Sequence, residues 1–144
     1  MNPGEGKPTR SDGSSYLGTR DTGLLATLGI VVTEATPERV VASMPVTAAH
    51  LQPHGILHGG ASVALAETVA SIGASVTLAG AQRAVGLEIN ANHLRAVTTG
   101  TLTATAVPLH TGRRTQVWTV EIREEQGRLV CASRCTLAIV AATG

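Results

Sequence analysis

A single carboxylate, Glu67, lies in the middle of a long stretch of small and apolar residues. Between Leu51 and Gln82 the chain has no other acidic residue and neither lysine nor arginine. A carboxylate is costly to bury among apolar side chains unless it is paired, hydrogen-bonded or used in chemistry. Glu67 is therefore a candidate nucleophile or general base. Two structural explanations stay open: the side chain faces a solvent-filled gap, or it pairs with an arginine such as Arg95.

A pair of glycines precedes this carboxylate, in the string His58-Gly59-Gly60 at the expected start of a helix. The first N–H groups of a helix have no partner inside the helix, and glycine lets a ligand oxygen approach the backbone closely. Such a helix start can polarise a carbonyl group or stabilise an oxyanion. The alternative is that the two glycines only form a tight loop.

The spacing of these two features predicts how they could act together. Glu67 follows Gly59 by eight residues, which corresponds to about 12 Å along a helix axis. One helix therefore cannot bring both groups to a single carbon atom. If they share a site, Glu67 of one protomer faces Gly59 of another, and the protein is at least a homodimer.

The chemistry-bearing residues belong to a pattern of two helices and six strands. A short helix is expected over residues 21–28, and a long helix from Gly59 to Leu78, where Gly80 marks the end. Alternating or β-branched segments predict strands at 30–34, 40–46, 84–95, 101–110, 115–123 and 128–140. Four strands after one long helix indicate an α+β fold, with an antiparallel sheet wrapped around the helix. Because the helix is apolar on nearly all sides, we expect it to be buried all round.

The 144 residues predict one domain at residues 21–144, preceded by a mobile tail at residues 1–20. The tail is rich in Gly, Ser, Pro, Thr and charged residues and has no apolar segment of signal-peptide length. Cys131 and Cys135 lie four residues apart on one expected strand, too far apart to form a disulfide. These features predict a cytoplasmic protein.

Composition argues against nucleic-acid and membrane partners. The chain has one tyrosine, one tryptophan, no phenylalanine and a net charge of +1, which leaves no stacking surface and no basic groove for nucleic acid. The most apolar segment, residues 61–80, carries Glu67 and five hydroxyl side chains, so we expect no membrane span there.

Three histidines, at positions 50, 54 and 58, have a spacing that suggests a metal site. Pro53 and Gly55 interrupt the helix that would align the three rings, and no cysteine or aspartate completes a ligand set. We therefore expect no metal.

Three strings carry a family resemblance: HGGAS at 58–62, LAE at 65–67 and VGLEINANH at 85–93. Over residues 21–140 the chain resembles the hotdog-fold acyl-CoA thioesterases, a group that includes 4-hydroxybenzoyl-CoA and phenylacetate-pathway thioesterases. The likeness is greatest to bacterial 1,4-dihydroxy-2-naphthoyl-CoA thioesterases. It implies a sheet of five or six antiparallel strands around one central helix, and hydrolysis of an acyl-CoA substrate, with an aryl-CoA favoured. It also implies homodimers with shared sites, often paired into tetramers.

The resemblance further implies roles for individual residues. Glu67 would act as nucleophile or general base, and the Gly59 N–H would polarise the thioester carbonyl. The remaining residues would position the reactants: His58 and Gln52 at the thioester and its sulfur, Ser71 at the attacking water, and Gly60 and His93 at the acyl group. The CoA arm would lie near His110, Arg113, Arg114 and Thr115, where guanidinium groups suit phosphates. No cofactor is implied, because CoA is part of the substrate.

Two other functions remain open at this point. One is a non-catalytic acyl-CoA-binding protein on the same fold, and the other is a hydratase that changes the acyl chain without cleaving the thioester. The first would bind acyl-CoA without releasing thiol, and the second would alter the acyl group without releasing thiol.

Overall fold

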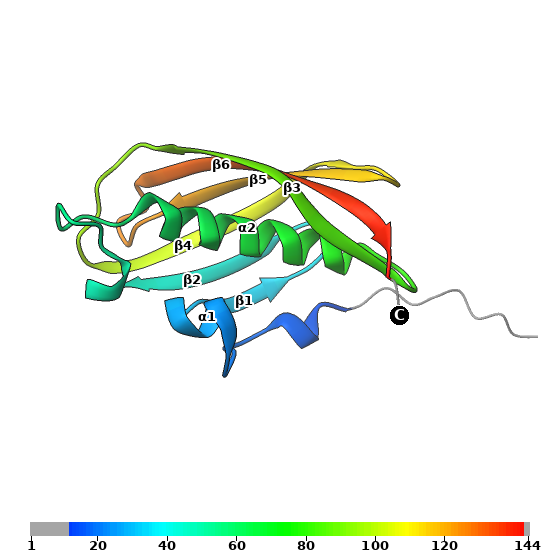
Figure 1. Cartoon of the computed structure of the whole chain (residues 1–144), viewed down its shortest axis with the longest axis horizontal. Helices are drawn as coiled ribbons and strands as arrows, with labels where there is room; N and C mark the ends of the chain where they lie inside the picture. Colours follow the sequence, from blue (N-terminus) through cyan, green and yellow to red (C-terminus); the bar gives the residue numbers. More distant parts are fainter. Residues whose placement is uncertain (1–11, 143–144) are drawn as a thin grey trace, which may run out of the picture.

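Six strands form one antiparallel sheet in the computed structural model, which describes residues 12–142 (Figure 1). The sheet order is β1-β2-β4-β5-β6-β3, and every neighbouring pair of strands is antiparallel. The strands are β1 (Val31–Ala35), β2 (Val40–Val46), β3 (Gln82–His93), β4 (Gly100–Thr111), β5 (Thr115–Arg123) and β6 (Leu129–Ala141). The predicted α+β arrangement with six strands is confirmed.

One long helix, α2 (Gly59–Val76), packs against all six strands (Figure 1). Where the sheet comes closest, the buried face of the helix has room only for a small residue, although larger side chains such as Leu65 and Val69 are also buried on this face. The clearest example is Gly73, where an added Cβ would lie 2.5 Å from the indole ring of Trp118 on β5. The buried Ala66, Ala70 and Ala74 keep the same close approach. The alanine-rich composition of α2 is therefore a requirement of the curved sheet.

The burial of α2 differs from the expectation that it is enclosed on all sides. Ten of its residues are buried, but a stripe along the opposite face is only partly buried or exposed. The stripe consists of Gly60, Val63, Ala64, Glu67, Thr68, Ser71 and Ser75. The physical reason is that the sheet curls around one side of the helix and leaves the other side open in the single chain.

The helix α2 is also the one described element with the length and hydropathy of a membrane span, and 56% of its residues are buried within the protein. That degree of burial is typical of the core helix of a globular domain.

The N-terminal part of the chain is more ordered than predicted from residue 12 onward. A 3₁₀ turn, η1, spans Ser14–Tyr16, and Gly18 forms a β-bridge with Val32, with N···O distances of 2.8 and 3.1 Å. The following helix, α1 (Gly23–Leu28), begins two residues later than predicted. Residues 12–20 of the expected tail are thus attached to the sheet, and residues 1–11 lie outside the described part of the chain.

The strand β3 lies at one edge of the sheet and passes over α2 (Figure 1). It is longer than predicted at its start, since pairing with β6 begins at Gln82. It ends at His93, two residues earlier than predicted, and the Leu94 N–H makes one further bond to β6, at the Val130 carbonyl. Its outer edge has no neighbouring strand among residues 12–142, and Val85 and Leu87 on it are exposed.

Candidate functional site

The start of α2 leaves one backbone donor free. His58 is the N-cap residue, and its Nδ1 accepts a hydrogen bond from the Gly60 N–H at 2.8 Å. Because Nδ1 is an acceptor, the neutral ring carries its proton on Nε2, which can donate to a ligand. The N–H of Gly59 has no hydrogen-bond partner in the described part of the chain. The helix start thus offers the free amide that the glycine pair predicted.

A cavity of about 250 Å³ opens beside this amide, and we refer to it as the Gly59 cavity. It is lined by Gln52, Ile56, Leu57, Gly59, Ser62, His93, Arg95, Ala96 and Val130. His93 lies over the helix start, because a Cβ added at Gly59 would be 2.9 Å from its Nε2. Gln52 accepts the His54 N–H through Oε1 at 2.6 Å, which leaves its amide NH₂ group as a donor. Three residues predicted from the sequence, Gln52, Gly59 and His93, therefore line one cavity.

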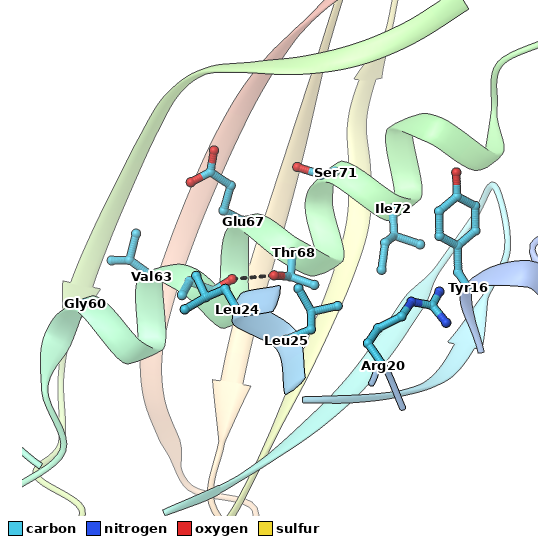
Figure 2. A pocket seen from close by; sticks show the side chains of 11 residues that line it. Tyr16, Arg20, Leu24, Leu25, Gly60, Val63, Glu67, Thr68, Ser71 and Ile72 are labelled. Atoms are coloured by element: carbon cyan, nitrogen blue, oxygen red, sulfur yellow. Dashed lines mark hydrogen bonds between the residues drawn. The ribbon is translucent and has the colours of Figure 1, made fainter. Parts of the chain in front are cut away.

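A second and larger cavity, about 610 Å³, lies along the open stripe of α2 and is called the Glu67 cavity (Figure 2). Seven of its lining residues come from α2: Gly60, Val63, Ala64, Glu67, Thr68, Ser71 and Ile72. The other four come from the N-terminal segment: Tyr16, Arg20, Leu24 and Leu25. Figure 2 shows Glu67 and Ser71 pointing to the same side of the helix. The walls are mainly aliphatic, with the Glu67 carboxylate and the Arg20 guanidinium as the two charged groups, so the cavity suits a hydrocarbon group.

The carboxylate of Glu67 forms no ion pair and no hydrogen bond with residues 12–142. The alternative of an ion pair with Arg95 is therefore wrong, since Arg95 lines the Gly59 cavity instead. The other alternative, a side chain facing an open gap, describes the geometry, and that gap is the Glu67 cavity.

The strand β3 lies directly against the carboxylate. A Cβ added at Gly86 would be 2.5 Å from Glu67 Oε1, so glycine at this position leaves room for the side chain. The buried thiol of Cys135 has its pKa raised to about 11, first by burial and then by the negative charges of Glu67 and Glu88. Because a nucleophilic cysteine must be a thiolate, Cys135 is not a candidate nucleophile near neutral pH. Glu67 therefore remains the candidate reactive group of this region.

Glu67 and Gly59 line different cavities within one chain. This agrees with the helix spacing, which separates them by about 12 Å along the axis. Within one protomer, the free amide at the start of α2 and the Glu67 carboxylate therefore cannot contact the same small group.

Four of the predicted substrate-binding residues lie elsewhere, at the turn between β4 and β5. They are His110, Arg113, Arg114 and Thr115. Arg113 lines a third cavity of about 560 Å³ together with Thr77 and Leu78, which follow the C-terminal end of α2. Within one chain this turn is at the far end of the helix from Gly59.

The histidine at position 50 has a structural role. Its Nδ1 contacts the Thr47 hydroxyl at 2.9 Å, and its Nε2 lies 2.8 Å from the Leu28 carbonyl oxygen. Both ring nitrogens are therefore used to hold the segment before α2. Among residues 12–142 there is no group of three potential metal ligands.

Some lining residues were missed by the sequence analysis. Tyr16 and Arg20 lie in the segment predicted to be a tail, and no local pattern shows that a β-bridge at Gly18 attaches that segment beside α2. Ser62 lies in the HGGAS string, but no role was predicted for it. Its burial beside Gly59 follows from helical spacing, because residues three apart share a face.

Comparison with known proteins gives consistent results. A family model described as "Thioesterase superfamily" matches residues 54–131. The 1,4-dihydroxy-2-naphthoyl-CoA hydrolase of Escherichia coli is 52% identical over 99 residues, covering 69% of this chain and 73% of that protein. The hydrolase of the same name from Listeria monocytogenes is 46% identical over 117 residues, covering 81% and 95%. A thioesterase crystal structure from Haemophilus influenzae superposes with a TM-score of 0.77 at 46% identity, covering 81% of this chain and 82% of that one.

Proposed function

Because the chain belongs to the thioesterase superfamily, has its hotdog fold and is a thioester hydrolase, we propose that its substrate is an aryl-CoA. The proposed products are the free aromatic acid and CoA, with benzoyl-type or 1,4-dihydroxy-2-naphthoyl groups as the acyl part. Two relatives named for hydrolysis of 1,4-dihydroxy-2-naphthoyl-CoA support this choice. The mainly aliphatic cavity beside Glu67 also supports it, since a flat hydrocarbon ring needs apolar walls.

The observation that carries the mechanism is the free Gly59 N–H at the start of α2. In the proposed mechanism this amide donates to the thioester carbonyl oxygen and stabilises the negative charge that develops there. Glu67 then either attacks the carbonyl carbon or takes a proton from an attacking water. In the first route the C–S bond breaks, CoA leaves as a thiolate that gains a proton, and water cleaves the resulting anhydride. In the second route water adds to the carbonyl carbon as Glu67 takes its proton, the C–S bond breaks, and CoA leaves as a thiolate that gains this proton.

Four further side chains position the reactants in this proposal. His58, with its proton on Nε2, and Gln52, with its free NH₂ group, hold the thioester and the leaving sulfur. Ser71 lies one turn after Glu67 on the same face and holds the attacking water. His93, which lies over Gly59 in the Gly59 cavity, and Gly60, which lines the Glu67 cavity, are assigned to the acyl group.

The CoA arm is assigned to the turn between β4 and β5. His110, Arg113, Arg114 and Thr115 are exposed there, and the two guanidinium groups suit the phosphates of the nucleotide. Because the turn lies far from Gly59 in the same chain, the arm that reaches Gly59 is expected to meet the turn of another protomer.

A homodimer with shared sites, paired further into a tetramer, is part of the proposal. The unpaired edge of β3 and its exposed Val85 and Leu87 provide a surface on which a second copy could pair. In such a dimer Glu67 of one protomer faces the Gly59 cavity of the other. The proposed reaction is acid–base and nucleophilic chemistry assigned to Glu67 and the helix start, and we propose that it uses no metal or cofactor. We also propose a cytoplasmic location, which the free thiols of Cys131 and Cys135 support.

A subunit-mixing experiment tests the shared site. Glu67→Ala and Gly59→Val variants are each expected to be inactive. When they are unfolded together and refolded, half of the dimers contain one of each chain, and each mixed dimer has one intact site. The mixture should recover about a quarter of wild-type activity by this counting. If the mixture stays inactive while size-exclusion chromatography shows mixed dimers, the shared site is wrong.

A substrate panel tests the reaction itself. Free-thiol release is measured with aryl, fatty and short-chain CoA esters, and kcat/KM is compared across the panel because specificity is a ratio of these constants. We expect the highest values with aryl esters. Binding without thiol release would indicate the acyl-CoA-binding function, and a changed acyl chain without thiol release would indicate a hydratase.

A further inference from the structure

The hydroxyl group of Ser62 is buried without a hydrogen-bond partner. The residue is 1% exposed, and Ser62 Oγ is the one buried side-chain N or O atom in residues 12–142 that lacks a partner. Leaving such a group unpaired costs about 1–3 kcal/mol. Because this unpaired hydroxyl destabilises the free protein, packing alone does not explain why position 62 is a serine.

Other hydroxyl groups on the same helix show what an ordinary structural role looks like here. Thr68 donates to the Ala64 carbonyl and Ser75 donates to the Ser71 carbonyl, each at 2.7 Å. These bonds to the preceding turn are the usual way for a helical hydroxyl to be satisfied. For Ser62 the corresponding acceptor is the carbonyl oxygen of His58, but the Ser62 hydroxyl does not donate to it. That oxygen accepts the Ala61 N–H at 3.0 Å.

The position of Ser62 connects it to the Gly59 cavity. Ser62 lines this cavity, follows Gly59 by three residues and therefore shares its helix face. The cavity thus has two unused donors at one end of the helix, the Gly59 N–H and the Ser62 O–H. Two unused donors that line one small cavity are the groups that an oxyanion-binding site requires.

We propose that the Ser62 hydroxyl donates a second hydrogen bond to the thioester carbonyl oxygen held by the Gly59 N–H. Ser62 is then a catalytic residue that touches the substrate, and the bond strengthens as the carbonyl oxygen gains negative charge. This inference depends on the proposed function, since it assigns a group to the same reaction.

The decisive variant is Ser62→Ala, which removes one oxygen atom and leaves the helix sequence otherwise unchanged. We expect kcat for an aryl-CoA to fall about 10²-fold, as when one donor of an oxyanion site is lost, while KM changes by less than about threefold. We expect Tm to stay the same or rise, because an unsatisfied buried hydroxyl is removed. The matched control is Ser75→Ala, which should keep kcat and lower Tm slightly because it loses a formed hydrogen bond.

A merely structural role gives the opposite pair of results. If Ser62→Ala lowers Tm and leaves kcat near the wild-type value, or lowers both together, the assignment is overturned. Failure of the proposed function looks different, because the wild-type protein would then release no thiol from any ester.

A binding measurement tests Ser62 without turnover. The probe is a ketone analogue of benzoyl-CoA, in which a methylene group replaces the sulfur and nothing can be cleaved. Its carbonyl stretch, measured by infrared difference spectroscopy, should move to lower frequency in the wild-type complex than in the Ser62→Ala complex. Equal frequencies in the two complexes would overturn the proposal.

Discussion

The two halves of α2 differ in how completely their polar groups are satisfied. At the C-terminal end, Trp118 donates to Gln116 Oε1 at 2.9 Å, and Gln116 donates to Thr77 Oγ1 at 2.6 Å. Thr77 donates in turn to the Ala74 carbonyl at 2.7 Å, so a continuous chain of hydrogen bonds joins β5 to the end of the helix. Toward the N-terminal end, the Gly59 N–H, the Ser62 hydroxyl and the Glu67 carboxylate have no such partners among residues 12–142.

This difference indicates that the two ends of α2 have different roles, one in stability and the other in chemistry. Groups that are satisfied inside the protein hold α2 against the sheet, and groups left unsatisfied are free to meet a substrate. Substitutions near the N-terminal end should therefore change kcat more than Tm, and substitutions at the C-terminal end should change Tm more than kcat.

The largest expected effect is that of Glu67→Gln. Losing the carboxylate should lower kcat about 10²–10⁴-fold if Glu67 is the general base, as is usual for a positioned acid–base group, and at least as much if it is the nucleophile. Tm should be unchanged, since Glu67 forms no ion pair in the described chain. Steady-state kinetics measure kcat, and thermal unfolding measures Tm. The control variant is Glu121→Gln, which removes an exposed carboxylate that pairs with Arg123. Near-wild-type turnover by a folded Glu67→Gln protein would remove Glu67 from the mechanism.

The substitution Trp118→Phe should have the next largest effect, on stability. It deletes the donor to Gln116 and leaves a void beside Gly73, where the indole ring fits against the helix backbone. We expect unfolding to become easier by about 2–3 kcal/mol, from an unpaired buried acceptor and lost packing. Urea denaturation measures this, and kcat at low temperature should stay within about twofold. A large loss of kcat with unchanged stability would contradict the division of the helix.

A smaller effect on activity is expected from Gly59→Ala. The new Cβ would lie 2.9 Å from His93 Nε2, so the His93 ring must shift away from the helix start. We expect kcat/KM to fall about tenfold or more, because displacing a positioning group by a fraction of an ångström is costly. Tm should stay the same or rise slightly, since alanine favours helix more than glycine. Crystals of the variant should show the displaced ring, and unchanged kcat/KM with a displaced ring would exclude a role for His93.

The smallest expected effect concerns the thiol of Cys135. Its pKa is raised to about 11, first by burial and then by Glu67 and Glu88, so Glu67→Gln should lower this pKa. Because the folded pKa lies above the unfolded value of 9.0, this thiol stabilises the fold below pH 9 and the stabilisation is lost as pH rises toward 11. Thiolate absorbance in a Cys131→Ser background measures the titration. An unchanged Cys135 pKa in Glu67→Gln would mean that the two groups do not interact.

Much of the fold followed from local sequence patterns. The six strands and the long helix were predicted with their ends displaced by a few residues, because alternation and glycine positions are local signals. The spacing of Gly59 and Glu67 also fixed their separation, since a helix has a constant rise.

The remaining features depend on contacts between distant segments. Attachment of residues 12–20 relies on the bridge from Gly18 to Val32, and no pattern near Gly18 encodes it. The open stripe of α2 was missed because alanine and serine tolerate both burial and exposure, so composition could not show on which side the sheet ends. The unpaired state of Ser62 depends on single hydrogen bonds, which no sequence pattern reports.

The contact between Trp118 and Gly73 also gives the protein a built-in optical probe. Trp118 is the only tryptophan in the chain and is fully buried, so its fluorescence arises from one defined environment. Emission should shift to longer wavelength when α2 separates from β5 and water reaches the indole. Ligands that enter the Gly59 cavity should leave the emission unchanged, because that cavity lies at the other end of the helix. Unfolding and turnover of the unlabelled protein can therefore be followed as separate signals, the first by emission wavelength and the second by thiol release.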